Sequence, residues 1–129
     1  MPRPNWVDDP AIPPDARLWR GVVTPDDIRT DADGNDVPSL GSLVTGEMSV
    51  ELAAESTLAD MFGKAAAAGV QWRIWEFTAG EARNAVLIVD RDPQPEDPAH
   101  CVVLRADEPG KRLKESQAKK LIKGGHWAN

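Results

Sequence analysis

A chain of 129 residues is long enough for one domain with a hydrophobic core and too short for two ordinary domains. Its composition, 41% hydrophobic and 28% charged, is typical of a globular protein and excludes a fully disordered one. The net charge of −6 and the pI of 4.8 disfavour nucleic acid as a partner. No apolar run approaches the ~18 residues of a membrane span, and the single cysteine cannot form an internal disulfide, so we expect a cytoplasmic protein without membrane contact.

The first part of the chain predicts an arm, a strand and a loop. Residues 1–16 carry five prolines, which exclude a regular helix or an interior strand, so we predict an extended arm followed by one domain over residues 17–129. Alternation predicts a short strand over residues 17–23, in which Gly21 indicates a bulge or a close backbone approach. The polar residues 24–42 predict a long loop without regular structure.

From residue 48 onward, the spacing of apolar residues predicts both strands and helices. Strands are predicted over residues 48–52, 70–77, 85–90 and 101–104. Helices are predicted over residues 57–68, 78–83 and 111–123. The strand at 85–90 is apolar nearly throughout, so we expect it in the middle of the sheet and buried on both faces. The element order predicts an α+β fold, a single compact domain with a mostly antiparallel sheet of four to five strands and two main helices.

Charge is distributed unevenly along the chain. Residues 1–60 hold four basic and twelve acidic residues, whereas residues 61–129 hold eleven basic and nine acidic ones. Six of those basic residues lie within the predicted helix at 111–123. This polarity favours an oriented contact with another protein or with a second copy of the chain, although a solvated lysine face is the more common reason for such a helix.

Two acidic segments are the candidate binding surfaces, the loop and the proline-rich turn after residue 90. The loop resembles a calcium loop counted from Asp31, but the positions that require Gly and Glu hold Asp36 and Ser42. The histidines and the cysteine lack the spacing of zinc ligands, and no glycine-rich phosphate motif is present, so we predict neither a metal nor a cofactor. The residues predicted to bind a partner are Asp26, Asp31, Asp33, Asp36, Asp92, Asp97 and His100.

His100 and Cys101 are adjacent in the sequence and are the first candidates for a catalytic Cys/His pair. Adjacent residues on a strand point to opposite faces, so these two cannot form the hydrogen bond that activates a thiol, and we interpret Cys101 as a small buried hydrophobic residue. His100 follows an acidic turn. It fits either a residue that fixes the shape of that turn or a residue of a functional site.

An enzyme alternative rests on Arg20, Ser49 and Glu81. They occur in the order in which ADP-ribosyltransferase folds place an arginine, a serine and a glutamate, and the candidate catalytic residues of this alternative are these three and His100. Each also has an ordinary structural explanation: Arg20 in an ion pair with a nearby aspartate, and Glu81 as a helix cap. Convergence of Arg20, His100 and Glu81 on one pocket would favour the enzyme or ligand-binding alternative.

Several short motifs resemble a group of small, uncharacterised bacterial proteins. They are Leu18-Trp19-Arg20, Pro38-Ser39, Met48-Ser49-Val50, Asp92-Pro93, Asp97-Pro98-Ala99-His100 and a basic helix ending in Trp127. The chain departs from that group at Leu40 and Cys101, where the group has an aromatic residue and an alanine, which speaks against a required thiol. The resemblance implies a free-standing prokaryotic domain and no particular activity.

These observations favour a non-enzymatic, cytoplasmic bacterial accessory protein that acts by binding another protein. The acidic loop between Asp26 and Asp36 and the turn between Asp90 and His100 are the expected contact surfaces, and self-association is a second form of the same hypothesis. The alternative is a small ADP-ribosyltransferase-like enzyme, or a binder of a small ligand that uses Arg20 and His100.

Overall fold

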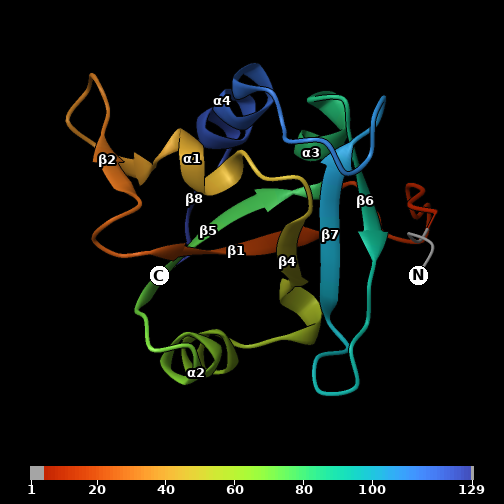
Figure 1. The fold of residues 1–129 in the computed structure, drawn as a ribbon, viewed down its shortest axis with the longest axis horizontal. Helices are drawn as coiled ribbons and strands as arrows, with labels where there is room; N and C mark the ends of the chain where they lie inside the picture. Colours follow the sequence, from red (N-terminus) through yellow and green to blue (C-terminus); the bar gives the residue numbers. More distant parts are fainter. Residues whose placement is uncertain (1–4, 129) are drawn as a thin grey trace.

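A six-stranded antiparallel sheet forms the centre of the computed structural model, which describes residues 5–128 (Figure 1). Its strands are β1 (Arg17–Val23), β4 (Met48–Leu52), β5 (Trp72–Thr78), β6 (Leu87–Arg91), β7 (His100–Arg105) and β8 (His126–Trp127). They lie in the order β6–β7–β4–β1–β5–β8, and every neighbouring pair is antiparallel. A separate hairpin of β2 (Ile28–Thr30) and β3 (Asp36–Pro38) projects from one end of the domain.

Helices lie on both faces of this sheet (Figure 1). One face is covered by α2 (Leu58–Ala67), and the other by α1 (Leu40–Leu43), α3 (Ala79–Asn84) and α4 (Glu115–Gly124). A single turn of 3-10 helix, η1 (Ala53–Glu55), follows β4. No helix within residues 5–128 has the length and apolar character that crossing a membrane requires.

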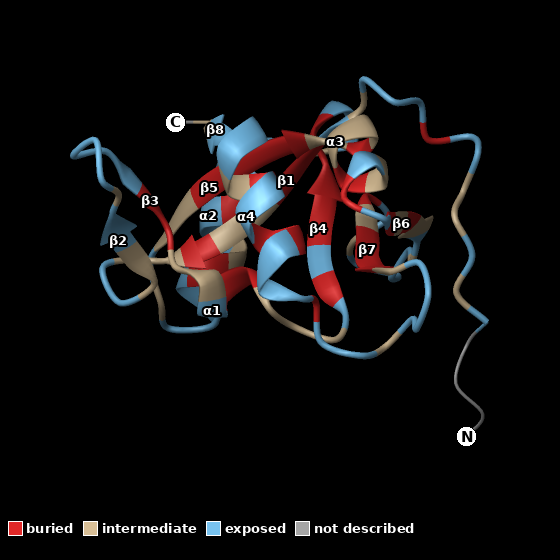
Figure 2. Ribbon diagram, turned by 90° about the horizontal axis from the view of Figure 1, so that it is seen from above, coloured by how far each residue is buried: buried red, intermediate tan, exposed pale blue. Residues whose placement is uncertain are grey.

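The sheet separates a large core from a small one. The large core lies between the sheet and the three helices, where the side chains of Leu18, Phe77 and Leu121 are fully buried. Burial of each such side chain stabilises the fold by about 1.5–3 kcal/mol. The small core lies under α2, where Met61 packs with Trp19. The strands between the two cores carry most of the buried residues of the molecule (Figure 2).

Local sequence signals set the ends of the helices. Thr57 caps α2 by accepting a hydrogen bond from a backbone N–H three residues on, and Thr78 and Glu81 form a capping box at α3, both as their spacing predicts. The last helix begins later than predicted. The backbone N–H of Leu113 donates instead to the carbonyl of Thr45 at 3.1 Å, and residues 112–114 have no regular secondary structure.

The α+β class and the antiparallel sheet are confirmed, but the sheet has six strands instead of four to five. The additional strand β8 has two residues, too few for a periodic pattern, and it pairs Trp127 with Trp75. The prediction that residues 85–90 lie in the middle of the sheet is wrong. Residues 87–90 belong to β6 at the edge of the sheet, whereas Ala85 is the C-cap of α3 and Val86 is 58% exposed with a φ of 61°.

The prediction of a structureless loop over residues 24–42 is also wrong, because this segment forms the β2–β3 hairpin and α1. Asp31 shapes the tip of the hairpin, where its Oδ1 accepts hydrogen bonds from the backbone N–H groups of Asp33 and Asn35, both at 2.9 Å. Gly34 next to them has a φ of 84°. These are properties of an Asx turn, so Asp31 organises the chain locally.

The described part of the N-terminal arm lies along the free edge of β6. The N–H of Asp9 donates to the carbonyl of Val89 at 2.9 Å, and the N–H of Val89 donates to Asp8 Oδ1 at 3.0 Å. Ile12 then enters the large core with 2% of its surface exposed. The arm therefore satisfies backbone groups that an edge strand otherwise presents to solvent or to another chain.

Candidate functional site

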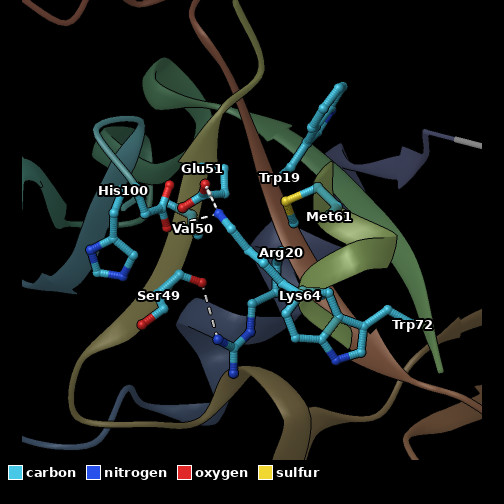
Figure 3. A pocket seen from close by; sticks show the side chains of 11 residues that line it. Trp19, Arg20, Ser49, Val50, Glu51, Met61, Lys64, Trp72 and His100 are labelled. Atoms are coloured by element: carbon cyan, nitrogen blue, oxygen red, sulfur yellow. Dashed lines mark hydrogen bonds and ion pairs between the residues drawn. The ribbon is translucent and has the colours of Figure 1, made fainter. Parts of the chain in front are cut away.

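A cavity of about 140 Å³ opens on the α2 side of the sheet and is called here the Glu51 cavity (Figure 3). It is lined by β1, β4, β7, α2, the start of β5 and the turn between β6 and β7. The lining residues are Trp19, Arg20, Gly21, Ser49, Val50, Glu51, Met61, Lys64, Trp72, Asp97 and His100. Residues from distant parts of the sequence therefore meet at one concavity, as binding sites require.

The alternation of β4 delivers two polar side chains to this cavity. Met48, Val50 and Leu52 are buried and belong to the large core, so Ser49 and Glu51 point to the opposite face, where α2 lies. Ser49 is exposed at the mouth, whereas only 4% of Glu51 is exposed.

The pairing register then sets the neighbours of Glu51. It lies opposite Trp19 of β1 on one side and opposite His100 of β7 on the other. Side chains that are directly opposite on antiparallel strands have Cβ atoms about 5 Å apart. The three residues therefore form a row across the floor of the Glu51 cavity.

Arg20 occupies the place where β1 and β4 separate. The two strands pair at Leu18 and Trp19 only, and beyond this point Arg20 donates one hydrogen bond to the Ser49 carbonyl at 3.1 Å and one to the Ser42 carbonyl at 3.0 Å. Burial lowers the pKa of the guanidinium, which a nearby aspartate partly offsets. Its Nε is buried and has no hydrogen-bond partner among residues 5–128.

The charged centre of the cavity is a cluster of Glu51, Lys64 and Asp97. Lys64 Nζ contacts Glu51 Oε1 and lies 2.8 Å from Asp97 Oδ2 (Figure 3). Burial, followed by a hydrogen bond with Asp97, raises the pKa of Glu51 to about 7, whereas hydrogen bonds with Glu51 and Lys64 outweigh burial and lower the pKa of Asp97. A proton in this cluster therefore resides on Glu51, and Asp97 carries the negative charge.

Lys64 remains a cation in this cluster. Burial acts to lower its pKa, but the hydrogen bonds with Asp97 and Glu51 outweigh burial and raise the pKa above its usual value. A lysine that acts as a nucleophile needs the opposite shift, so Lys64 supplies charge and N–H donors and no Schiff-base chemistry. The same three residues also line a wider groove of about 520 Å³ between α2 and the β6–β7 turn.

Two tryptophans and a methionine form the apolar wall of the cavity. Trp72 lies against the backbone of Gly21, where an added Cβ would be 2.4 Å from the indole ring, so the predicted close approach at Gly21 is confirmed. Trp19 is fixed through its Nε1, which donates to Glu76 Oε1 at 2.9 Å. Met61 of α2 completes the wall.

His100 both supports the β6–β7 turn and faces the cavity. Its Nδ1 lies 2.9 Å from the carbonyl oxygen of Asp92 and 3.2 Å from Asp92 Oδ2, which fixes the ring relative to the turn. The backbone N–H of His100 donates to the carbonyl of Asp97 at 3.3 Å. The two roles considered for His100 in the sequence are therefore compatible in one side chain.

The structure brings together some of the predicted site residues and separates others. Arg20, Ser49, Asp97 and His100 line the Glu51 cavity. Glu81 does not, because its side chain accepts a hydrogen bond from the N–H of Thr78 at 2.9 Å and caps α3. The arrangement of arginine, serine and glutamate that suggested an ADP-ribosyltransferase therefore has no counterpart in this cavity.

The predicted binding aspartates fall into two groups. Asp92 and Asp97 belong to the β6–β7 turn, as described above. The others lie in or next to the projecting β2–β3 hairpin: Asp26, Asp31, Asp33 and Asp36. Within the described residues, no group of three His, Cys, Asp or Glu side chains is arranged to hold a metal ion.

Sequence reasoning missed Glu51 and Lys64, although each breaks a pattern. Glu51 is a charged residue in β4, and β4 lies between two longer, largely buried strands, β1 and β7. Lys64 lies three residues after Met61 and one before Ala65, on the apolar face of α2. Phe62, an apolar residue next to Met61 in the sequence, is by contrast 38% exposed.

Cys101 is excluded from the chemistry of the site. Its side chain is fully buried in the large core, on the opposite face of β7 from the cavity, which confirms its interpretation as a small hydrophobic residue. Burial also raises the pKa of the thiol to about 12.

Comparison with family models, with curated proteins and with solved structures gives no match to this chain.

Proposed function

We propose that this protein binds a small molecule in the Glu51 cavity, where Glu51 exchanges a proton with the bound molecule or with water. One observation carries the proposal: polar side chains from β1, β4, α2, β7 and the β6–β7 turn converge on one concavity, next to an aromatic wall. A carboxyl group whose pKa is about 7 is well matched to proton transfer at neutral pH.

The packing around the charges supports a binding role over a purely structural one. Protein interiors are close-packed, and a buried ion pair contributes little to stability compared with apolar side chains of the same volume. If this network served only stability, we would expect side chains to fill the space around it and every buried polar atom to have a hydrogen-bond partner. Here an open cavity lies next to three charged groups, and Arg20 Nε has no partner within the described chain.

The tryptophans of the cavity provide the experiment. Trp19 and Trp72 report on binding through their fluorescence and their indole N–H resonances, so the protein is titrated with a broad set of small polar and aromatic fragments. We expect at least one chemical class to shift both signals in a saturable way. Lys64→Met should abolish the effect, and Lys119→Met, which removes an exposed lysine of α4, should retain it.

A set in which no fragment moves the two indole resonances would contradict the proposal. Shifts that are the same in Lys64→Met and in the native protein would also contradict it, because they would place binding elsewhere. The fold of each variant is checked by its far-ultraviolet circular dichroism and its unfolding midpoint.

We propose, as a second function, a protein contact through the acidic β2–β3 hairpin. The hairpin extends beyond the body of the domain and is largely exposed (Figures 1 and 2). Its base is attached firmly, because Trp127 Nε1 donates to the Asp36 carbonyl at 2.9 Å and Arg73 lies 3.6 Å from Asp36 Oδ2. A fixed acidic projection suits a basic partner, and the lysine-rich α4 of a second copy has the required charge.

Mass measurement in native solution tests this second function. Contact between the hairpin and α4 predicts a dimer that dissociates as salt is raised and that the double substitution Asp31→Lys and Asp33→Lys prevents. Glu47→Lys, an exposed change outside the hairpin that has the same sign and half the total charge, is the control. A monomer at every concentration and low salt would leave no support for self-association.

A further inference from the structure

Resting on the second function proposed above, the contact between the acidic hairpin and a second copy of the chain, we infer that the hairpin tip binds in a pocket beside Val86 of that copy. The pocket, called here the Val86 pocket, has a volume of about 200 Å³ and lies between the first half of α4 and the segment that joins α3 to β6. It is lined by Ala85, Val86, Asp107, Lys114, Ser116, Gln117 and Lys120.

Val86 has a backbone conformation that is costly for its side chain. Its φ of 61° lies in the left-handed region, which β-branched residues rarely adopt, and the residue is exposed. Gln117 holds this backbone in place, since its Nε2 donates to the carbonyls of Ala85 at 3.1 Å and of Val86 at 3.3 Å. Glycine or asparagine would fit here without strain, and the valine side chain gains little burial within one chain. Strained residues cluster at functional positions, so we assign the Val86 side chain to a contact with another molecule.

The charges around Val86 favour an acidic partner. Lys114 and Lys120 line the pocket, and neither forms an ion pair within residues 5–128. Asp107 is the acidic residue of the lining, and Arg105 neutralises it through two hydrogen bonds at 3.0 and 2.8 Å. The pocket therefore presents two ammonium groups together with one exposed apolar side chain.

The hairpin tip has the complementary pattern. Asp31, Ala32 and Asp33 follow one another there, so a small apolar side chain lies between two carboxylates, and Ala32 and Asp33 are exposed. The Asx turn at Asp31 and the hydrogen bond of Trp127 to the hairpin base fix the tip before it binds. A segment that is already ordered loses less conformational entropy on binding, which favours this tip over a flexible acidic peptide as the occupant.

The positions of the hairpin and the Val86 pocket suit a symmetric pair of chains. The hairpin projects at one end of the domain, the junction of α3 and β6 lies toward the other end, and α4 lies between them (Figures 1 and 2). Two copies that meet through the α4 face, with a two-fold axis near α4, can place each hairpin over the pocket of the other copy. Both contacts then form at once, and the acidic tips offset the repulsion between the two lysine-rich helices.

Val86→Asn tests the apolar part of the contact. Asparagine tolerates the left-handed conformation, so the variant should unfold at a midpoint at least as high as that of the native protein. Its dimer dissociation constant, measured by sedimentation equilibrium of the full chain at low salt, should rise at least about fivefold. Val7→Asn is the matched control, because Val7 is also exposed but lies in the arm, and it should leave the constant unchanged. Unchanged dimerisation of Val86→Asn would overturn the inference.

Charge exchange between two variants tests the pairing of the hairpin with the pocket. The hairpin variant carries Asp31→Asn, which retains an Asx turn, and Asp33→Lys. The pocket variant carries Lys114→Glu and Lys120→Glu. Each variant alone opposes like charges and should be monomeric. An equimolar mixture should restore a dimer with one chain of each kind, because each hairpin then meets a pocket of opposite charge.

A second pair of lysines provides the control for the mixture. Lys111→Glu with Lys123→Glu changes the net charge by the same amount at exposed residues outside the pocket lining. This variant should not restore a dimer when it is mixed with the hairpin variant. Equal restoration by both lysine pairs, or by neither, would overturn the Val86 pocket as the binding site.

The outcomes separate this inference from the second function on which it rests. A salt-sensitive dimer that the hairpin variant prevents, but that Val86→Asn and the pocket variant leave intact, supports the contact of the hairpin with a second copy and overturns the pocket as its site. A dimer that only the pocket variant prevents assigns the pocket to another acidic segment, which also overturns the inference. A native protein that stays monomeric at low salt and high concentration overturns both.

Discussion

At the floor of the cavity, the side chain of Glu51 is almost completely buried and yet ionisable. Its pKa is about 7 in the folded protein, compared with an ordinary value of 4.5, chiefly because burial disfavours the charged form. The folded state therefore holds this proton more tightly than the unfolded state does. The stabilisation from protonation is complete below about pH 4.5 and is lost as the pH rises through about 7.

We predict that Glu51→Gln removes this pH dependence. At ~1.4 kcal/mol for each pKa unit, the native protein should lose up to about 3 kcal/mol of unfolding free energy between pH 5 and pH 8, and Glu51→Gln should lose much less, because glutamine does not ionise. The pKa of Asp97 lies below this range, so Asp97 contributes little to the slope. Urea unfolding at several pH values measures the difference.

Glu47→Gln is the matched control, since Glu47 is exposed just before β4. It should reproduce the native slope. Equal slopes in the native protein and in Glu51→Gln would show that Glu51 has an ordinary pKa, and the role of this carboxyl in proton exchange would then have no support.

At the level of elements, the class of the fold was predictable because local patterns determine it. Period-two alternation over residues 48–52, helical spacing from Thr57 and the Thr78–Glu81 capping box each rest on residues close together in the sequence. The position of each strand within the sheet depends on pairing between distant residues. The apolar run over residues 85–90 was therefore identified as a strand but was assigned to the middle of the sheet instead of its edge.

The candidate site was predictable only in part for the same reason. Arg20 attracts attention as a charged residue within a predicted strand and His100 as a polar residue just before one, and both line the cavity. Glu51 and Lys64 become important because the strand register and the docking of α2 bring them into contact. Glu81 was a candidate catalytic residue but does not line the cavity, since a local capping interaction holds its side chain at α3.

Gly21 links the strand β1 to the wall of the cavity, and we predict that Gly21→Ala disrupts it. The new Cβ would lie 2.4 Å from the Trp72 ring, so the indole has to move, at a cost of about 1–3 kcal/mol for overpacking. Gly63→Ala in α2 is the control: its Cβ meets no atom within 4 Å, and it should stabilise the protein by up to ~1 kcal/mol because alanine favours the helix.

Unfolding free energies and the Trp72 indole resonance measure both effects. The prediction requires that Gly21→Ala shifts this resonance and that Gly63→Ala leaves it in place. An equally stable Gly21→Ala protein with an unchanged spectrum would mean that the close packing of Trp72 on β1 is not a feature of the molecule in solution.

On the scale of the whole molecule, the two edges of the main sheet are protected from pairing with another chain in different ways. The β8 edge is short, with only His126 and Trp127 in the strand. The β6 edge is longer and is covered by the arm, where Asp8 connects two elements by accepting hydrogen bonds from Val89 N–H and from Arg83 Nε, each at 3.0 Å. Covering an edge in this way prevents pairing with another chain.

Deletion of residues 1–11 should therefore convert the protein to a self-associating form. The deletion leaves Ile12 in the core but exposes the N–H and carbonyl of Val89, which are then free to pair with the β6 edge of a second copy. Sedimentation velocity over a range of concentrations should show dimers that high salt does not dissociate, since backbone hydrogen bonds hold them. Deletion of residues 1–4 alone keeps the contacts of Asp8 and Asp9 and should behave as the full chain. A folded monomer after the longer deletion would show that the arm is not what keeps this edge unpaired.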